Sequence, residues 1–180
     1  MKTWIVLFRG INVGGKNMLP MKLLTALLEE AGCRDVRTYI QSGNVVLRSP
    51  LSDASRVATR IRMAVSDSRG FEPRVLVLNR AELQKAMAAN PYREATAHPK
   101  SVHLFFLAER PTHPDIESLN GIKAKSESFT LDGRILYLHT PEGFGTSKLA
   151  ERAERCLDVA ATARNWRTCS ALLELAASYE

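Results

Sequence analysis

The first 79 residues combine four short apolar runs with two amphipathic stretches, and the order of these segments leaves few possible folds. The short runs predict strands, whereas the apolar residues of the longer stretches recur at helical spacing. The predicted strands cover 3–9, 36–40, 44–48 and 74–79, and the predicted helices cover 20–31 and 52–68. This order is the ferredoxin-like arrangement, in which one antiparallel sheet carries both helices on one face.

This topology places two loops at the same end of the sheet. The first crossover is right-handed, so the first two strands run parallel and the third strand lies between them. The loop after residue 9 and the turn after residue 40 then lie on neighbouring strands about 5 Å apart. The residues that we expect to face one another are Gly14, Gly15, Lys16 and Asn17 on the loop, and Gln41, Ser42 and Asn44 on the turn.

The second half predicts another α+β sub-domain. Its predicted strands cover 102–107, 126–131 and 134–139, and its predicted helices cover 80–89, 114–119, 147–157 and 163–178. Asp132-Gly133 is a strong signal for a two-residue hairpin turn. The series strand, helix, strand, strand, helix resembles an incomplete copy of the first half. We therefore predict an α+β protein of two ferredoxin-like sub-domains, residues 1–79 and 80–180, that ends in helices.

The loop from Gly10 to Asn17 matches the phosphate-loop spacing G-x-x-x-x-G-K, but it lacks the final Ser or Thr that binds Mg²⁺. This difference argues against a nucleotide hydrolase. Glycines at 14 and 15 still allow backbone N–H groups to converge on an anion, and Lys16 adds positive charge beside them. Arg9 and Asn12 flank the same loop, and together with Asn17 they are candidate ligand-binding residues. The alternative is a flexible connection in which Lys16 points to water.

The turn Gln41-Ser42-Gly43-Asn44 also has two interpretations. Ser, Gly and Asn supply turn chemistry without any ligand. Alternatively, Gln41, Ser42 and Asn44 present neutral hydrogen-bonding groups beside the glycine loop. Ser42 lacks a base that would make it a nucleophile, because no histidine falls in the first half of the chain.

Two segments near the C-terminus pair a predicted helix start with a cation. Residues 143–148 resemble the first loop, with glycines followed by hydroxyls and a lysine, and residues 162–168 open the predicted last helix. Exposed amides at a helix start favour an anion, and the two arginines of the second segment would share a helix face. The alternative is helix capping by Ser147 or Thr162. The candidate ligand-binding residues of these segments are Lys148, Arg164, Asn165 and Arg167.

Composition favours an anionic partner and a cytoplasmic location. Lys and Arg outnumber Asp and Glu by 25 to 19, which gives a net charge of +6. No apolar run approaches the roughly 20 residues that cross a bilayer, and the N-terminus lacks the pattern of a signal peptide. The 3 cysteines and 4 histidines lack the spacing of a metal site, so we predict no metal. No general acid–base pair is evident, and we assign neither a reaction nor a cofactor.

Three segments in combination resemble the domain of unknown function 1697 family of uncharacterised bacterial proteins. They are Phe8–Asn17, Tyr39–Val46 and Thr162–Thr168, which span the chain. The resemblance implies a two-part α+β structure with ferredoxin-like halves. The family carries no established activity, so the resemblance transfers no catalytic residue.

These patterns favour a protein that binds a small anionic molecule, such as a nucleotide or a sugar phosphate, at the end of the first sheet. Gly14, Gly15 and Lys16 would form the cradle, and Gln41, Ser42 and Asn44 would orient the ligand. The residues expected to approach from the second half are Arg164, Asn165 and Arg167.

Two other functions stay open at this point. Ferredoxin-like sheets can present stacking aromatic side chains to single-stranded RNA, which makes a nucleic-acid-binding module possible. The sequence does not favour this function, because the run Val45-Val46-Leu47 offers no aromatic platform. A structural or oligomerising protein without a ligand would explain the apolar sheets but not the polar loops.

Overall fold

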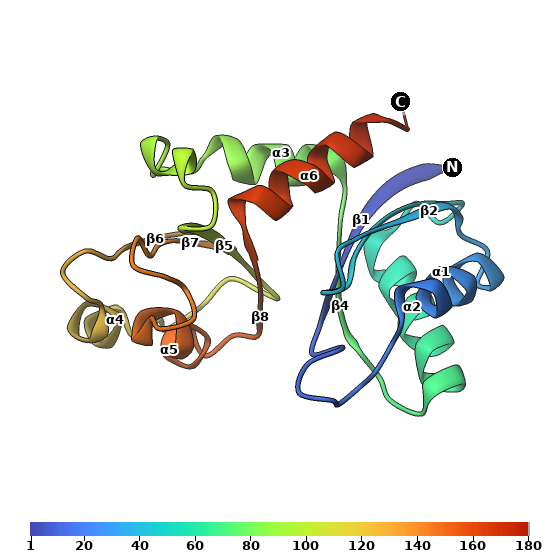
Figure 1. The fold of residues 1–180 in the computed structure, drawn as a ribbon, viewed down its shortest axis with the longest axis horizontal. Coiled ribbons are helices and arrows are strands. Elements are labelled where there is room, and N and C mark those ends of the chain that lie inside the picture. The colour runs from blue at the N-terminus through green and yellow to red at the C-terminus, as the bar shows by residue number, and fades with distance from the viewer. Residues whose placement is uncertain (180) are drawn as a thin grey trace. The chain divides into compact units, whose positions relative to one another are not determined.

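The computed structural model describes residues 1–179, whose strands form two separate four-stranded antiparallel sheets with helices (Figure 1). One unit contains Met1–Lys85 together with the residues from Ser170 onward, and the other contains Ala86–Cys169. The α+β class and the two similar sub-domains are therefore confirmed. The division lies between residues 85 and 86 rather than between 79 and 80, and the C-terminal segment joins the first unit instead of the second.

The first unit has the strand order β2-β3-β1-β4, so β3 lies between β1 and β2 as predicted. Its elements are β1 (Lys2–Arg9), α1 (Met21–Glu30), β2 (Arg34–Tyr39), β3 (Asn44–Ser49), α2 (Ala54–Arg69) and β4 (Arg74–Leu78). Both helices pack on one face of the sheet. Their buried side chains share a core with those of Trp4, Val6 and Phe8, which are 4%, 0% and 1% exposed. Asp53 caps α2, and Gly70 ends it in the left-handed conformation.

The second unit repeats this arrangement completely, with the strand order β6-β7-β5-β8. Its elements are β5 (Val102–Leu107), α4 (Ile116–Ile122), β6 (Ser128–Asp132), β7 (Ile135–His139), α5 (Lys148–Leu157) and β8 (Ala161–Asn165). The remaining elements are α3 (Arg80–Ala88), the 3-10 helix η1 (Glu94–Ala97) and α6 (Trp166–Ala177).

The prediction of an incomplete second copy was wrong, because it assigned residues 163–178 to one helix. Residues 161–165 instead form β8, which pairs with β5 along its whole length, and the helix begins only at Trp166. The segment Ala-Thr-Ala-Arg-Asn alternates apolar and polar residues over only four positions, and its apolar residues are alanines, which favour a helix over a strand. Its strand conformation therefore depends on backbone pairing with a distant strand, which local periodicity does not reveal.

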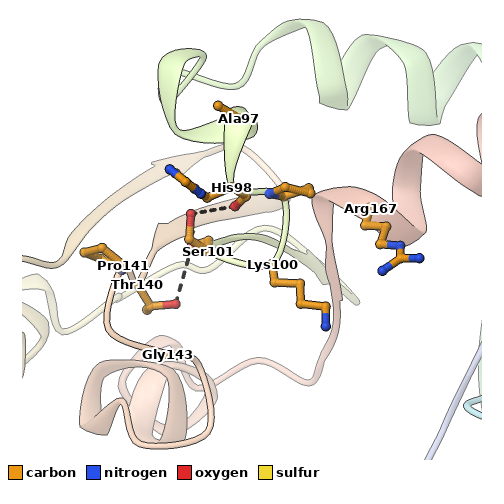
Figure 2. Close-up of a pocket in the computed structure, with 9 residues that line it drawn as sticks. Ala97, His98, Lys100, Ser101, Thr140, Pro141, Gly143 and Arg167 are labelled. Atoms are coloured by element: carbon orange, nitrogen blue, oxygen red, sulfur yellow. Dashed lines mark hydrogen bonds between the residues drawn. The ribbon is translucent and has the colours of Figure 1, made fainter.

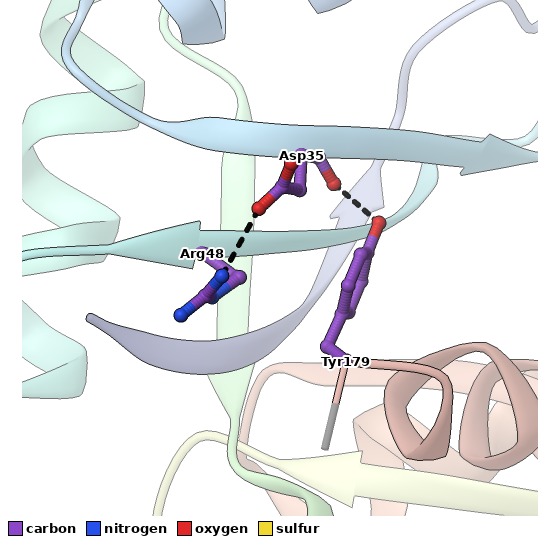
Figure 3. A network of polar contacts seen from close by, with 3 residues as sticks. All are labelled: Asp35, Arg48 and Tyr179. Carbon is purple, nitrogen blue, oxygen red and sulfur yellow. Dashed lines mark hydrogen bonds and ion pairs between the residues drawn. The ribbon is translucent and has the colours of Figure 1, made fainter.

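The C-terminal segment is anchored to β2 within the first unit (Figure 3). The Tyr179 hydroxyl donates to the backbone carbonyl of Asp35, and Arg48 Nη1 lies 3.3 Å from Asp35 Oδ2. The guanidinium of Arg37 lies 5.2 Å from the centre of the Tyr179 ring. Asp35 has φ of +52° and lies between Arg34 and Arg37, where the register of the β2–β3 pairing shifts.

Removing the Tyr179 hydroxyl tests this anchor. We expect Tyr179→Phe to lower the free energy of unfolding by about 1 kcal/mol, because it deletes one hydrogen bond but keeps the ring beside Arg37. Urea denaturation measures the change. Tyr39→Phe is the matched control, since the Tyr39 hydroxyl has no partner among residues 1–179. Equal effects of the two substitutions would contradict the anchoring role.

Candidate functional site

The glycine loop after β1 is a tight reversal. Val13 and Lys16 form an isolated antiparallel bridge, and the Lys16 amide donates to the Val13 carbonyl at 3.1 Å. Between them, Gly14 and Gly15 have φ of +58° and +73°. Positive φ at both central positions is the geometry of a type I′ turn, which glycine adopts without a steric cost. The tip of the loop is therefore a two-residue turn that holds Lys16 next to two glycines.

Asn12 fastens this loop to the β2–β3 turn. Its Oδ1 accepts from the Leu19 amide at 2.7 Å, and its Nδ2 donates to the carbonyls of Leu19 and Gln41 at 2.9 and 3.2 Å. At the other side of the loop, Asn17 Nδ2 donates to the Gly10 carbonyl at 3.0 Å. The bond to Gln41 confirms that the loop and the turn meet at one end of the sheet.

The close approach of loop and turn depends on Gly43. The Phe8 amide donates to the Gly43 carbonyl at 2.8 Å. A Cβ added to Gly43 would lie 2.6 Å from Phe8 Cβ and 2.7 Å from Ile11 Cδ1, and the residue has φ of +74°. Glycine is therefore required here for both space and backbone conformation.

The turn residues divide into a buried group and an exposed group. Asn44 is 0% exposed, and its Nδ2 donates to the Tyr39 carbonyl at 3.1 Å and to Ser42 Oγ at 2.8 Å. Both hydrogens of this amide thus stabilise the turn. Gln41 and Ser42 are exposed, so their side chains face solvent beside the glycine loop.

This end of the first sheet is positively charged. Residues 9–20 and 39–44 contain Arg9 and Lys16 but no Asp or Glu. Arg74 lies opposite Arg9 in the β1–β4 pairing, and Arg69 Nη2 donates to the Met18 carbonyl at 3.1 Å. Cations from four segments therefore lie at this end of the sheet, where Glu72, two residues before Arg74, is ion-paired with Arg62 at 3.6 Å.

The candidate residues of the second unit lie on different elements. Lys148 is the exposed first residue of α5, whose start is capped by a bond of 3.0 Å from the Ala150 amide to Ser147 Oγ. Arg164 belongs to β8, so the prediction that it shares a helix face with Arg167 was wrong. Burial lowers the pKa of Arg164 to about 10, which leaves it charged at neutral pH.

Asn165 acts as the cap of α6. Its Oδ1 accepts from the Thr168 amide at 2.8 Å, so the alternative interpretation of helix capping holds for Ser147 in α5 but not for Thr162. Thr162 instead lies in β8, where it is 8% exposed. The approach of Arg164, Asn165 and Arg167 to the first loop stays a prediction.

Sequence reasoning missed a cavity of about 410 Å³ in the second unit (Figure 2). Arg167 and Gly143, which were singled out for other reasons, line it together with His98 and Lys100. The last two residues belong to an irregular stretch before β5 that carries no recognised motif. Their only local signal was a cation and a histidine beside Pro99, which does not indicate a site without the distant residues that complete it.

The structure shows no metal-binding cluster in the described part of the chain. No three His, Cys, Asp or Glu side chains among residues 1–179 are grouped so that they could hold an ion. Cys33, Cys156 and Cys169 are free thiols. In the same residues, every helix is too short or too polar to cross a membrane.

Comparisons with other proteins identify a family and a fold. A family model described as "Protein of unknown function (DUF1697)" matches residues 1–137. No curated protein matches the chain. The solved structure of conserved bacterial protein SP0830 from Streptococcus pneumoniae is similar, with a TM-score of 0.68 and 20% sequence identity. The similarity covers 97% of this chain and 98% of that chain. At this identity, the likeness shows a shared fold.

Proposed function

We propose that this chain, which belongs to the DUF1697 family of proteins of unknown function, binds a small phosphate-bearing or otherwise anionic ligand at the loop end of its first sheet. The observation that carries this proposal is the hydrogen bond of 3.2 Å from Asn12 Nδ2 to the Gln41 carbonyl. It holds the glycine loop and the polar turn together, so that groups from both can contact one ligand.

The backbone of the loop supports an anion. The amides of Gly14 and Gly15 have no hydrogen-bond partner among residues 1–179. No atom lies within 4 Å of where a Cβ would stand at either residue, so a ligand can approach the main chain closely. Backbone N–H groups at such a turn are good donors to phosphate or carboxylate oxygens. Exposed Lys16 supplies a charge beside them.

The side chains fall into contacting and positioning roles. Lys16, Gln41 and Ser42 are exposed and would contact the ligand. Asn12, Asn17 and Asn44 use their amides to hold the loop and the turn, so they would position the site. The positive charge of exposed Lys16 would favour an anion over a cation or a neutral molecule.

Five of the seven aromatic side chains in the strands are buried, and only Tyr39 and Phe129 are partly exposed, which favours a small anion over single-stranded nucleic acid. Phe105, Phe106 and Tyr137 in the second sheet are 5%, 3% and 1% exposed. Trp4 and Phe8 in the first sheet are 4% and 1% exposed. These rings cannot stack on bases without unfolding, and base stacking is the main source of sequence-tolerant binding to single strands.

Titration with anions tests the proposal. We expect inorganic phosphate, pyrophosphate or AMP to shift the amide resonances of Gly14 and Gly15 in ¹⁵N-resolved NMR spectra. Lys16→Ala should raise the Kd at these resonances about tenfold, because it removes one charge-assisted contact.

Lys125→Ala removes another exposed lysine, in the second unit, and should leave this Kd unchanged. The proposal is wrong if no anion shifts Gly14 and Gly15, or if Lys16→Ala binds like the wild type. Binding of a single-stranded oligonucleotide with a steep salt dependence, in the absence of binding by small anions, would instead support the nucleic-acid function.

A further inference from the structure

The cavity of about 410 Å³ in the second unit is independent of the glycine loop, because all residues that line it lie between 97 and 167. It lies at the start of β5 and beside the segment that follows β7. We infer that this cavity is a second binding site, specific for a phosphomonoester that carries a small organic group. The inference does not rest on the function proposed above.

Residues that line the cavity are joined to one another by hydrogen bonds. Ser101 Oγ and the Ser101 amide both donate to the His98 carbonyl at 2.8 Å. The Thr140 amide donates to the Ser101 carbonyl at 2.8 Å, and the Gly143 amide donates to the Thr140 carbonyl at 3.1 Å. Ser101 and Thr140 are 9% and 0% exposed. Figure 2 shows these two residues side by side. The shape of the cavity therefore exists before a ligand arrives.

Two cations in the cavity have no partner. Lys100 precedes β5 and Arg167 lies in α6, and Figure 2 shows their side chains extending toward the same region. Neither charged group makes a hydrogen bond or an ion pair with any of residues 1–179. None of the lining residues is acidic. The cavity thus carries two uncompensated positive charges, which a single dianion would neutralise.

The chemistry and the size of the cavity indicate the class of ligand. A guanidinium donates two parallel hydrogen bonds to phosphate oxygens, and an ammonium adds a third contact. The ring of exposed His98 supplies one more polar group. The volume falls in the range of small-molecule sites and exceeds the needs of a lone phosphate. Pro99 and Pro141 give the remaining space a partly apolar lining. A sugar phosphate or a mononucleotide meets these requirements.

The experiment follows the amide resonance of Gly143 while ribose 5-phosphate, inorganic phosphate, ribose and acetate are added in turn to the full chain. Ribose 5-phosphate should shift Gly143 saturably, with a lower Kd than inorganic phosphate, and ribose should have no effect. Lys100→Gln and Arg167→Gln should each raise the Kd for ribose 5-phosphate at least fivefold, and the double variant should abolish binding. The Kd of Arg167→Lys for ribose 5-phosphate should lie between those of the wild type and Arg167→Gln, since lysine keeps the charge but lacks the two parallel donors.

Lys125→Gln is the matched control, because Lys125 is exposed in the same unit but does not line the cavity. The inference is overturned if ribose 5-phosphate leaves Gly143 unshifted, if the Lys100 and Arg167 variants bind like the control, or if acetate binds as tightly. Shifts confined to Gly14 and Gly15 would overturn this inference and leave the proposed function standing. Shifts confined to Gly143 would support this inference and contradict the proposed function at the glycine loop.

Discussion

Gly43→Ala is expected to lower the free energy of unfolding by about 3 kcal/mol. The added methyl group would lie 2.6 Å from Phe8 Cβ and 2.7 Å from Ile11 Cδ1. Phe8 and Ile11 are 1% and 2% exposed, so neither has room to move away. Overpacking of a buried site costs roughly 1–3 kcal/mol, and the left-handed backbone conformation of an L-residue adds about 1 kcal/mol. Urea denaturation followed by circular dichroism measures the loss.

Gly70→Ala is the matched control for this substitution. Gly70 has φ of +72°, close to the +74° of Gly43, but no atom lies within 4 Å of its added Cβ. The control therefore carries the conformational cost without the steric one, and should lose only about 1 kcal/mol. Equal losses in the two variants would show that the loop and the turn do not depend on the small size of Gly43.

Acidification from pH 6.5 to pH 4 is expected to destabilise the protein through His103. This residue is 8% exposed, its ring stacks on Phe144 with centres 3.8 Å apart, and its Nδ1 is buried without a partner. Burial lowers the pKa of His103 from 6.5 to about 4. The unfolded chain therefore binds a proton in this interval that the folded chain does not bind. The free energy of unfolding decreases as the pH is lowered from 6.5 to 4.

Below pH 4, the free energy of unfolding is lower by about 3 kcal/mol because of His103. Above pH 6.5, His103 causes no such loss. His103→Phe keeps an aromatic ring against Phe144 but cannot be protonated. Its stability should change less than that of the wild type between pH 6.5 and pH 4, and urea denaturation at a series of pH values measures both curves. His113→Phe, at an exposed position, is the control and should behave like the wild type. Parallel curves for wild type and His103→Phe would refute the assignment to His103.

The asparagines of the loop illustrate how far the sequence could predict the site. Asn12, Asn17 and Asn44 were predicted as ligand contacts because they lie beside glycines in two polar turns. The structure shows that their amides hold the main chain. An asparagine side chain can bond either to its own backbone or to a ligand, and both uses favour the same kind of turn. Only the position of distant carbonyls, such as that of Gln41, distinguishes the two uses.

The cavity in the second unit could not be predicted at all. Its positive charge comes from Lys100 and Arg167, which lie on segments far apart in the chain. Arg167 was predicted as a ligand contact for another site, at a helix start shared with Arg164, and Lys100 was not predicted as a site residue at all. Pairing of β5 with β8 brings the residues after β8 to the start of β5, where His103 lies opposite Asn165. The missed strand β8 therefore hid the cavity as well.

For the first unit, the sequence by itself determined the order of strands and helices, and with it the strand order β2-β3-β1-β4 that brings the glycine loop to the turn. Periodicity and the handedness of the crossover act over short stretches, so one chain segment at a time is enough to infer them. Only the tertiary structure decided which asparagine side chains hydrogen-bond to the main chain. It also decided that residues 161–165 form a strand and that two cations far apart in the chain line one cavity. These features depend on contacts between residues far apart in the chain, and a local sequence pattern does not reveal such contacts.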